Sequence, residues 1–171
     1  GCGPVGLACI ADLKMRGIGP VVAADFSPKR RALAEALGAD VVVDPREETA
    51  IDAWRRVANG RQLVIFEAVG VPGMIHEAMR VSPRNTRIVV VGACMQQDSV
   101  FPMLGIGKEL NIQFVLGYDP NEFNGALTAI ADGRVDLSSW VTGTVGIDDV
   151  PQAFLDLGNP EQHAKILVMP R

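Results

Sequence analysis

The sequence has no excess of basic residues and no block of lysine or arginine. Its 171 residues include 16 Lys and Arg against 20 Asp and Glu, which gives a net charge of -4. Nucleic-acid binders usually present a basic face to the phosphate backbone, so we expect no nucleic-acid partner. Long apolar runs are also missing: the longest are strand-sized, such as 88–91, whereas a membrane span needs roughly 20 apolar residues. We therefore expect no membrane partner.

Cysteine and histidine are scarce. Cys2, Cys9 and Cys94 are too few and too scattered for a disulfide framework or a C-x-x-C metal site, so we expect reduced thiols and a cytoplasmic protein. His76 and His163 have no second ligand at metal-binding spacing. The spacing of these residues therefore predicts no metal ligand in this chain.

Glycine is concentrated at the start of the sequence. Gly1, Gly3 and Gly6 form the pattern G-C-G-P-V-G, and Asp25 follows Gly6 by 19 residues at the end of an apolar run. This spacing is the known dinucleotide-binding fingerprint, in which the glycines permit a tight turn, close approach of a pyrophosphate and close packing of the next helix. The glycines alone are weak evidence and are compatible with a purely structural strand-to-helix turn. Because Pro4 has no N–H, the phosphates would take amides from its neighbours, chiefly Val5.

The acid at the second strand end selects the coenzyme. A carboxylate at Asp25 can accept hydrogen bonds from adenosine ribose hydroxyls but repels a 2′-phosphate, so we predict NAD(H) as cofactor and not NADP(H). The alternative is that Asp25 caps a turn before Ser27. Arg30, one turn into the next helix, either reaches the ribose or adenine or is an ordinary solvated arginine.

Strand-like and helix-like segments alternate along the chain. Apolar, β-branched runs bounded by turn residues predict strands at 20–25, 40–43, 63–67, 86–92 and 111–117. Helical periodicity with capping residues predicts helices at 5–15, 28–37, 47–58, 72–81 and 120–131. Continuous apolar strands indicate a parallel sheet covered on both faces, hence a doubly wound α/β fold of the Rossmann type.

The organisation is that of a partial fold. Residue 1 already lies in the glycine turn, so the first strand is missing and we expect a fragment of a longer protein. Residues 1–136 are predicted to form the dinucleotide-binding domain, and Val100–Met103 a short edge strand. Residues 137–171 are predicted to form a small β-α-β tail, with strands at 141–145 and 164–169 and a helix starting at Asp148.

Two later strands also end in residues suited to a binding groove. Ligands of an open parallel sheet lie beyond the carboxyl ends of its strands, which places backbone groups of Val69, Gly70, Val91 and Gly92 along the predicted groove. The alternative is that these glycines only end the strands. Glu67 at the end of its strand is interpreted as a hydrogen-bonded carboxylate and not as a general base.

With these residues in view, the chain resembles the coenzyme-binding portion of the zinc-dependent medium-chain alcohol dehydrogenase family, nearly from end to end. The segments that carry the resemblance are G-C-G-P-V-G-L at 1–7, A-D-F-S-P-K-R-R at 24–31, L-G-A-D at 37–40, F-E-A-V-G at 66–70, V-V-V-G at 89–92 and A-K-I-L-V at 164–168.

The resemblance implies a two-domain enzyme that transfers hydride between a small alcohol or carbonyl substrate and NAD. It places Val5 at the pyrophosphate, Asp25 and Arg30 at the adenosine ribose and Val69 beside the coenzyme. It also places backbone groups at the nicotinamide carboxamide, those of Val91, Phe114 and Leu116. Zinc and the proton relay would belong to a catalytic domain outside this chain, so the chain is expected to hold no catalytic residue and to be inactive alone. The resemblance further implies a homodimer or higher oligomer formed through Val100–Met103, and residues 137–171 as the segment that returns to the catalytic domain.

Three alternatives remain at this point. The chain is the coenzyme domain of a zinc-free quinone reductase-like relative, an S-adenosylmethionine-dependent methyltransferase, whose cofactor loop is also rich in glycine, or a non-catalytic nucleotide-sensing module. A short-chain dehydrogenase is disfavoured because Tyr118, the only tyrosine, lacks a lysine four residues later.

Overall fold

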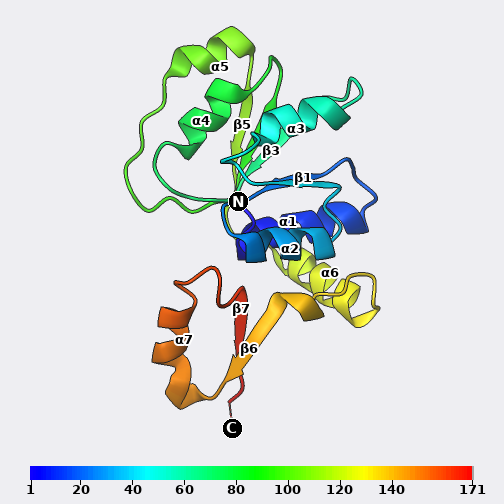
Figure 1. The fold of residues 1–171 in the computed structure, drawn as a ribbon, viewed down its shortest axis with the longest axis vertical. Coiled ribbons are helices and arrows are strands. Elements are labelled where there is room, and N and C mark those ends of the chain that lie inside the picture. Colours follow the sequence, from blue (N-terminus) through cyan, green and yellow to red (C-terminus); the bar gives the residue numbers. More distant parts are fainter. Residues whose placement is uncertain (171) are drawn as a thin grey trace.

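A computed structural model describes residues 1–170 and shows alternating helices and parallel strands (Figure 1). The helices are α1 Pro4–Met15, α2 Pro28–Ala36, α3 Ala50–Val57, α4 Met74–Val81, α5 Pro102–Lys108, α6 Pro120–Ala131 and α7 Val150–Asp156. The strands are β1 Val22–Ala24, β2 Val41–Val43, β3 Val64–Glu67, β4 Arg87–Val90, β5 Asn111–Phe114, β6 Val141–Val145 and β7 Lys165–Val168. Short 3₁₀ turns occupy Ser138–Trp140 and Ile147–Asp149.

The strands form three parallel sheets. β1 pairs with β2, β4 lies between β3 and β5, and β6 pairs with β7. The parallel α/β architecture predicted from the sequence is therefore confirmed. Within the described residues β1 and β3 belong to different sheets, and the N-terminal dipeptide lies between their carboxyl ends, since Gly1 packs beside Val69 and the Cys2 amide donates to Asp25.

Local signals set most helix boundaries. The Ser27 hydroxyl accepts a hydrogen bond from the Arg30 amide at 3.1 Å, and Pro28 occupies the first helical position of α2, where its missing N–H costs nothing. Gly38, with φ of +93°, follows the end of α2 in the left-handed conformation that glycine adopts most readily. Asp119 and Glu122 form a capping box at α6. The Ser27 cap and the Gly38 stop expected from the sequence are thus found in the structure, and the Asp119 capping box is an additional cap.

Each of the first two sheets has a separate apolar core. Leu7 of α1, Ala23 of β1 and Ala34 of α2 are fully or almost fully buried in the first core. Met79 of α4 and Ile88 of β4 are buried in the second core. The glycine turn lies between the carboxyl ends of β1 and β3, so a ligand bound at the turn would lie beside both sheets.

The predicted edge strand at Val100–Met103 is wrong. Val100 and Phe101 are irregular, and α5 starts at Pro102, which has a φ suited to a first helical turn and no N–H to donate to a strand ladder. Within the described residues, the edge strands of the three-stranded sheet are β3 and β5, each of which pairs with β4 on one side.

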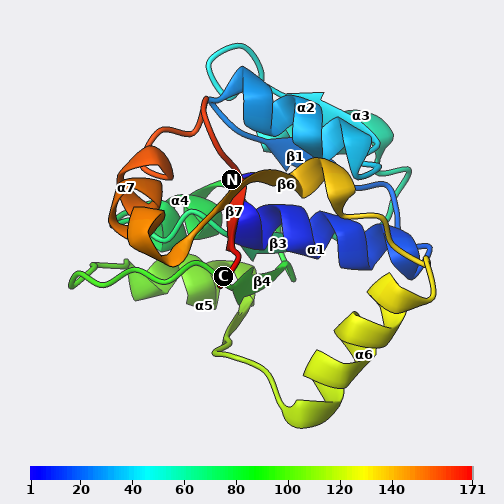
Figure 2. The same ribbon diagram turned by 90° about the horizontal axis from the view of Figure 1, so that it is seen from below.

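The C-terminal β6–α7–β7 unit has the predicted order, although its helix starts later than expected. A 3₁₀ turn at Ile147–Asp149 precedes α7, which begins at Val150. In Figure 1 this unit lies below α1 and α2, so in Figure 2, which is seen from below, β6 and β7 lie in front of the start of α1. The Lys29 ammonium of α2 donates a hydrogen bond of 2.6 Å to the Gln162 carbonyl, which ties the segment before β7 to the first sheet. In the described part of the chain, every helix is too short or too polar to span a bilayer.

Asp40 links α1 to the first two strands. Its carboxylate accepts hydrogen bonds from the Val21 amide at 2.7 Å and from the Lys14 ammonium at 2.9 Å. The Val21 amide first, and then Lys14, lower the pKa of Asp40. A depressed carboxyl pKa contributes stability that is present above the unfolded value, about 3.9, and is lost as pH falls through the folded value.

We therefore expect the Asp40→Asn variant to be less stable than the natural protein near neutrality and to lose less stability as the pH falls below about 4. Urea unfolding at a series of pH values measures both slopes. Parallel slopes for the two proteins would contradict the assignment.

Candidate functional site

The three glycines of the N-terminal turn occupy three different environments. A Cβ at Gly6 would collide with the carbonyl oxygen of Gly1, and one at Gly1 would lie 2.9 Å from Val69 Cγ2. At Gly3, by contrast, the nearest atom to a Cβ would be Nη1 of Arg30, at 3.9 Å. Gly1 and Gly6 thus allow tight packing, whereas Gly3 leaves the approach to the backbone open.

The start of α1 is suited to an anion. Gly3 is its N-cap, it has no side-chain cap, and its first turn contains no acidic residue. Pro4 has no N–H, and the amides of Val5 and Gly6 precede the first intrahelical donor, Leu7, which bonds to the Gly3 carbonyl at 2.9 Å. Amides in this position have no intrahelical partner and carry the positive end of the helix dipole. Val5, which is half exposed, and Gly6 can therefore donate to phosphate oxygens.

Asp25 lies beside this turn, where β1 ends. Its Oδ2 accepts from the Cys2 amide at 2.7 Å and its Oδ1 from the Ser27 amide at 2.8 Å, so the turn-capping alternative is part of its role. Each carboxylate oxygen has two acceptor positions, and both oxygens therefore keep capacity for a ligand hydroxyl. Nη1 of Arg30 lies 4.0 Å from Oδ2, and Nε of Arg30 is buried without a hydrogen-bond partner among the described residues.

A second carboxylate organises the ends of β3 and β4. The buried Glu67 accepts hydrogen bonds through Oε1 from the amides of Val69 and Gly70, at 2.7 and 3.1 Å. Its carbonyl oxygen accepts from the amides of Val91 and Gly92, at 2.9 and 2.8 Å. Glu67 is therefore the hydrogen-bonded strand-end carboxylate that the sequence suggested. Because all four of these amides are engaged, this wall of the groove has carbonyl oxygens, and not amides, to offer a ligand.

The predicted site residues do not all meet. Gly1, Gly3 and Gly6, together with Asp25 and Arg30, surround the glycine turn, and Val69 packs on Gly1. Gly70 and Gly92 are in tight contact with each other at the ends of β3 and β4. Leu116 follows β5 and is 99% exposed, so it lies at the same end of the sheet but outside this packed cluster.

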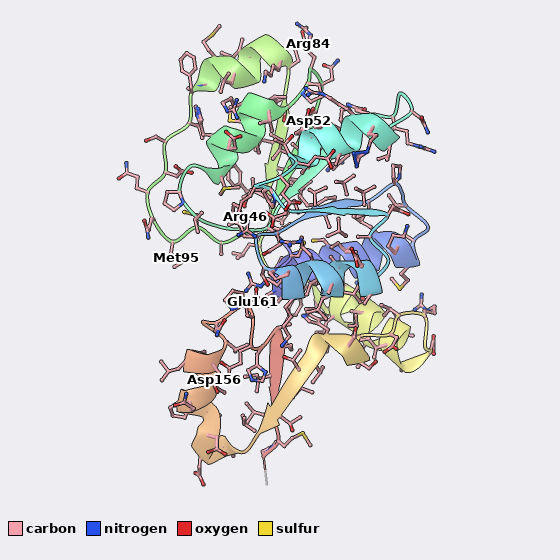
Figure 3. The ribbon with its side chains drawn as sticks, in the orientation of Figure 1. Arg46, Asp52, Arg84, Met95, Asp156 and Glu161 are labelled. Carbon is pink, nitrogen blue, oxygen red and sulfur yellow. The ribbon has the colours of Figure 1, made fainter. Side chains whose placement is uncertain are left out.

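A group of residues beyond Asp25 was not foreseen. Asp44 ends β2 as Asp25 ends β1, and it forms ion pairs with Arg46 and with Arg31. The Arg46 guanidinium lies 5.7 Å above the centroid of the exposed Phe26 ring (Figure 3 labels Arg46) and, with Arg31, holds the pKa of Asp44 far below its usual range. The repeated pattern of an apolar strand followed by Asp was the sequence signal for this group.

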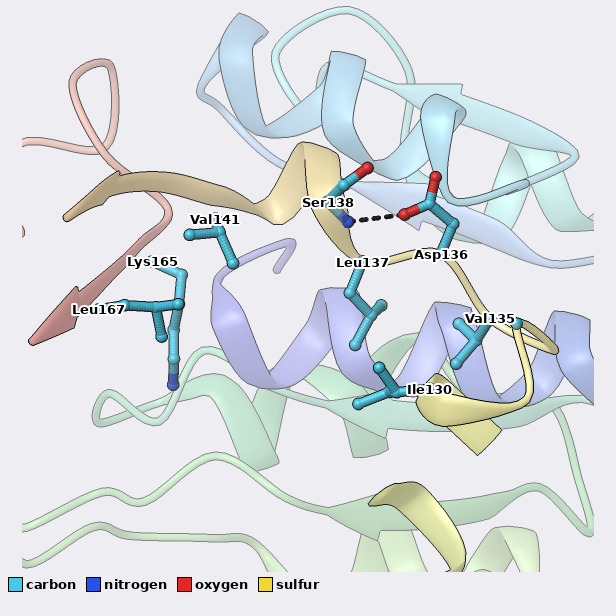
Figure 4. Close-up of a pocket in the computed structure, with 9 residues that line it drawn as sticks. Ile130, Val135, Asp136, Leu137, Ser138, Val141, Lys165 and Leu167 are labelled. Carbon is cyan, nitrogen blue, oxygen red and sulfur yellow. Dashed lines mark hydrogen bonds between the residues drawn. The ribbon is translucent and has the colours of Figure 1, made fainter. Parts of the chain in front are cut away.

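A separate cavity lies near the C-terminal strands. It has a volume of about 590 Å³ between the end of α6, residues 133–141 and strands β6 and β7 (Figure 4). Its walls are mainly apolar, with Asp136 and Lys165 as the charged side chains. No predicted site residue lines it, and it holds no pair of groups suited to acid–base chemistry. Within residues 1–170, no group of three or more His, Cys, Asp or Glu side chains is placed to hold a metal ion.

An uncapped glycine turn at the start of a helix, with an acid at the end of the neighbouring parallel strand, is typical of dinucleotide-binding domains of the α/β class. Residues 4–132 match the sequence profile of the zinc-binding dehydrogenase family. The chain belongs to this family.

Its relatives are zinc-type alcohol and polyol dehydrogenases. (R,R)-butanediol dehydrogenase of Bacillus subtilis is 30% identical over 99% of this chain and 49% of its own length. L-idonate 5-dehydrogenase (NAD(P)(+)) of Escherichia coli is 30% identical over 97% of this chain and 48% of its own. The solved structures of these two enzymes superpose with TM-scores of 0.84 and 0.86, covering 100% and 99% of this chain and 49% and 48% of their own. The chain thus spans about half the length of the curated relatives it matches, and these relatives give no support to the quinone reductase, methyltransferase or sensor alternatives.

Proposed function

We propose that this chain is the coenzyme-binding part of a zinc-type alcohol or polyol dehydrogenase, and that it binds NAD(H) at the glycine turn. The observation that carries the proposal is the Asp25 carboxylate, fixed by two backbone amides beside the uncapped start of α1. In the whole protein the reaction would be hydride transfer between a secondary alcohol and NAD. The names of the relatives, which act on butanediol and idonate, support a small alcohol as substrate.

Each part of the turn has one task in this proposal. The amides of Val5 and Gly6 donate to the pyrophosphate, and Asp25 accepts from the adenosine ribose. The carbonyl oxygens of Val69 and Val91 suit donor groups of the coenzyme, because the neighbouring amides are bound to Glu67. When bound, the nicotinamide supplies the carbon that accepts or gives the hydride.

The preference between NAD and NADP depends on two opposing charges. Asp25 repels a 2′-phosphate, and Arg30, with its guanidinium 4.0 Å away, attracts one. Two backbone amides fix the Asp25 carboxylate at the turn, whereas the Nε of Arg30 has no hydrogen-bond partner among the described residues. We therefore propose NAD(H) as the preferred coenzyme, although one relative is named for both.

Zinc does not fit the residues of this chain. The described residues offer no ligand set for it, so we derive no step through zinc here and propose that its ligands belong to the rest of the protein. The chain alone would then bind coenzyme without oxidising alcohols. Residues 137–171 as a segment of the catalytic domain, a cytoplasmic location and a homodimer also remain predictions. The half-paired β5, whose Phe114 is 68% exposed, is the edge that such a dimer would use.

The test is a fluorescence titration of the intact protein that contains this chain, with NADH, NADPH and S-adenosylmethionine as ligands. We expect NADH to bind, NADPH to bind at least about tenfold more weakly, which corresponds to about 1.4 kcal/mol, and S-adenosylmethionine not to bind. Preference for NADPH, or no binding of NADH, would refute the proposal. Alcohol-dependent NAD reduction by residues 1–171 alone would refute the claim that this part is inactive.

A further inference from the structure

The connection between β4 and α5, residues 91–101, is longer than any other connection between two elements of the described chain. It begins with Val91 and Gly92, which form part of the proposed coenzyme groove, and Met95 near its middle is 91% exposed. Figure 1 shows it running as an open loop beside the connection from β3 to α4, and Figure 3 shows Met95 at the outer edge of the molecule. A loop of this length needs tethers if its first residues are to keep one position.

The first tether is the close contact between Gly92 and Gly70. A Cβ at Gly92 would lie 2.8 Å from Oε2 of Glu67 and closer still to the Gly70 amide nitrogen. Gly70 has a φ of +71°, and a Cβ there would lie 2.8 Å from the amide nitrogen of Ala93. The two connections that follow β3 and β4 are thus packed backbone against backbone.

The second tether is Asp98. Its Oδ1 accepts hydrogen bonds from the amide of Gly73 at 2.9 Å and from the amide of Ser99 at 2.8 Å. Gly73 is the N-cap of α4 and has a φ of +86°. Asp98 therefore joins the far end of the loop to the start of the helix that follows β3, and residues 93–97 lie between the two tethers.

The second carboxylate oxygen of Asp98 reduces the stability that this tether provides. Oδ2 is buried and has no hydrogen-bond partner among the described residues. A buried acceptor without a partner costs free energy, which offsets part of what the Oδ1 bonds contribute. The Asp98 tether is therefore weaker than its two hydrogen bonds suggest.

We infer that Asp98 is a positioning residue for the coenzyme. It holds loop 91–101 on α4, so that the wall formed by Val91 and Gly92 is already ordered before the coenzyme arrives. This inference rests on the proposed NAD(H) site. Without Asp98 the loop would have one tether and would be less ordered in the free protein. Coenzyme binding would then have to order the loop, and this entropic cost lowers the affinity for the coenzyme and speeds its release.

The experiment compares Asp98→Ala, Asp98→Asn and the natural protein, each as the intact protein. Asn keeps a carbonyl oxygen that can accept the same amides, whereas Ala keeps none. Asp136→Ala is the matched control, because Asp136 also accepts a backbone amide, that of Ser138 at 2.8 Å, in the segment between α6 and β6. Hydrogen exchange of the Gly73 and Ser99 amides reports the tether, and stopped-flow displacement of NADH reports the rate of release.

For Asp98→Ala we expect faster exchange at both amides and about a tenfold faster release of NADH. Asp98→Asn should stay within about threefold of the natural protein, since hydrogen bonds to a neutral acceptor are weaker but still form. Asp136→Ala should change neither readout.

Two outcomes would overturn the inference and leave the proposed function intact: unchanged exchange at Gly73 and Ser99, or faster exchange with an unchanged rate of NADH release. A third outcome is different, because it appears in the natural protein. If that protein binds no NADH, the proposed function fails and the inference fails with it.

Discussion

Replacing Gly6 with alanine is expected to lower the affinity for NADH by at least about 100-fold, because the added methyl group overlaps the backbone of the glycine turn. A Cβ at Gly6 collides with the carbonyl oxygen of Gly1 and approaches its carbonyl carbon to 3.0 Å. Both are main-chain atoms, so no side-chain rotation relieves the overlap. The turn must shift, and the amides of Val5 and Gly6 shift with it. Fluorescence titration with NADH and thermal unfolding measure the two consequences.

Gly125→Ala is the control for this variant. Gly125 lies inside α6, and a Cβ at that position would have no neighbour within 4 Å. Alanine is the better helix former, so we expect a gain of about 0.5–1 kcal/mol in stability and no change in NADH affinity. If Gly6→Ala binds NADH as tightly as the control, close approach at this turn is not required for the coenzyme.

Replacing Asp25 with asparagine is expected to change the ratio of NADPH to NADH affinity by about 100-fold in favour of NADPH. The substitution removes the negative charge that would face a 2′-phosphate and leaves the Arg30 guanidinium without its partner. It also weakens the turn. Asp25 now accepts hydrogen bonds from two backbone N–H groups, and in the variant the side-chain NH₂ group would face one of them and could not accept its hydrogen bond. That second effect acts equally on both coenzymes and cancels in the ratio.

The measurement is a pair of titrations, NADH and NADPH, on Asp25→Asn and on Asp12→Asn. Asp12 is an exposed partner of Arg16 on α1, and its substitution should leave the ratio unchanged. An unchanged ratio in Asp25→Asn would mean that another group selects the coenzyme.

The parts of the fold that the sequence predicted well depend on local chemistry. Ser27 followed by Pro28, and Gly38 after α2, each act within one helical turn, so their positions follow from the neighbouring residues alone. The strand expected at Val100–Met103 shows that an apolar run alone does not predict a strand. Pro102 begins helix α5 here, although the residues on both sides of it are apolar.

The candidate site divides in the same way. Glycine spacing and the acid at 25 identified the turn, but the contacts that shape it are long-range: Cys2 to Asp25, Gly92 to Gly70, and Asp98 to Gly73. No periodicity encodes such contacts. The engagement of the Val69 and Gly70 amides by Glu67 is a short-range contact that the sequence could have suggested, since a strand-end acid commonly accepts from the amides two and three residues on. The roles of individual site residues and the domain boundary near residue 136 stay predictions.

The hydrogen bond from the Lys29 ammonium to the Gln162 carbonyl connects helix α2 to the segment before β7. Lys29 precedes Arg30 on α2, so the segment before β7 is attached to α2 next to the proposed ribose position. The contact is exposed to water and is worth only about 0.5–1.5 kcal/mol, so thermal motion can undo and remake it many times during the life of the folded protein. The segment that leads into β7 and the proposed ribose position are therefore contacted by adjacent residues of the same turn of α2.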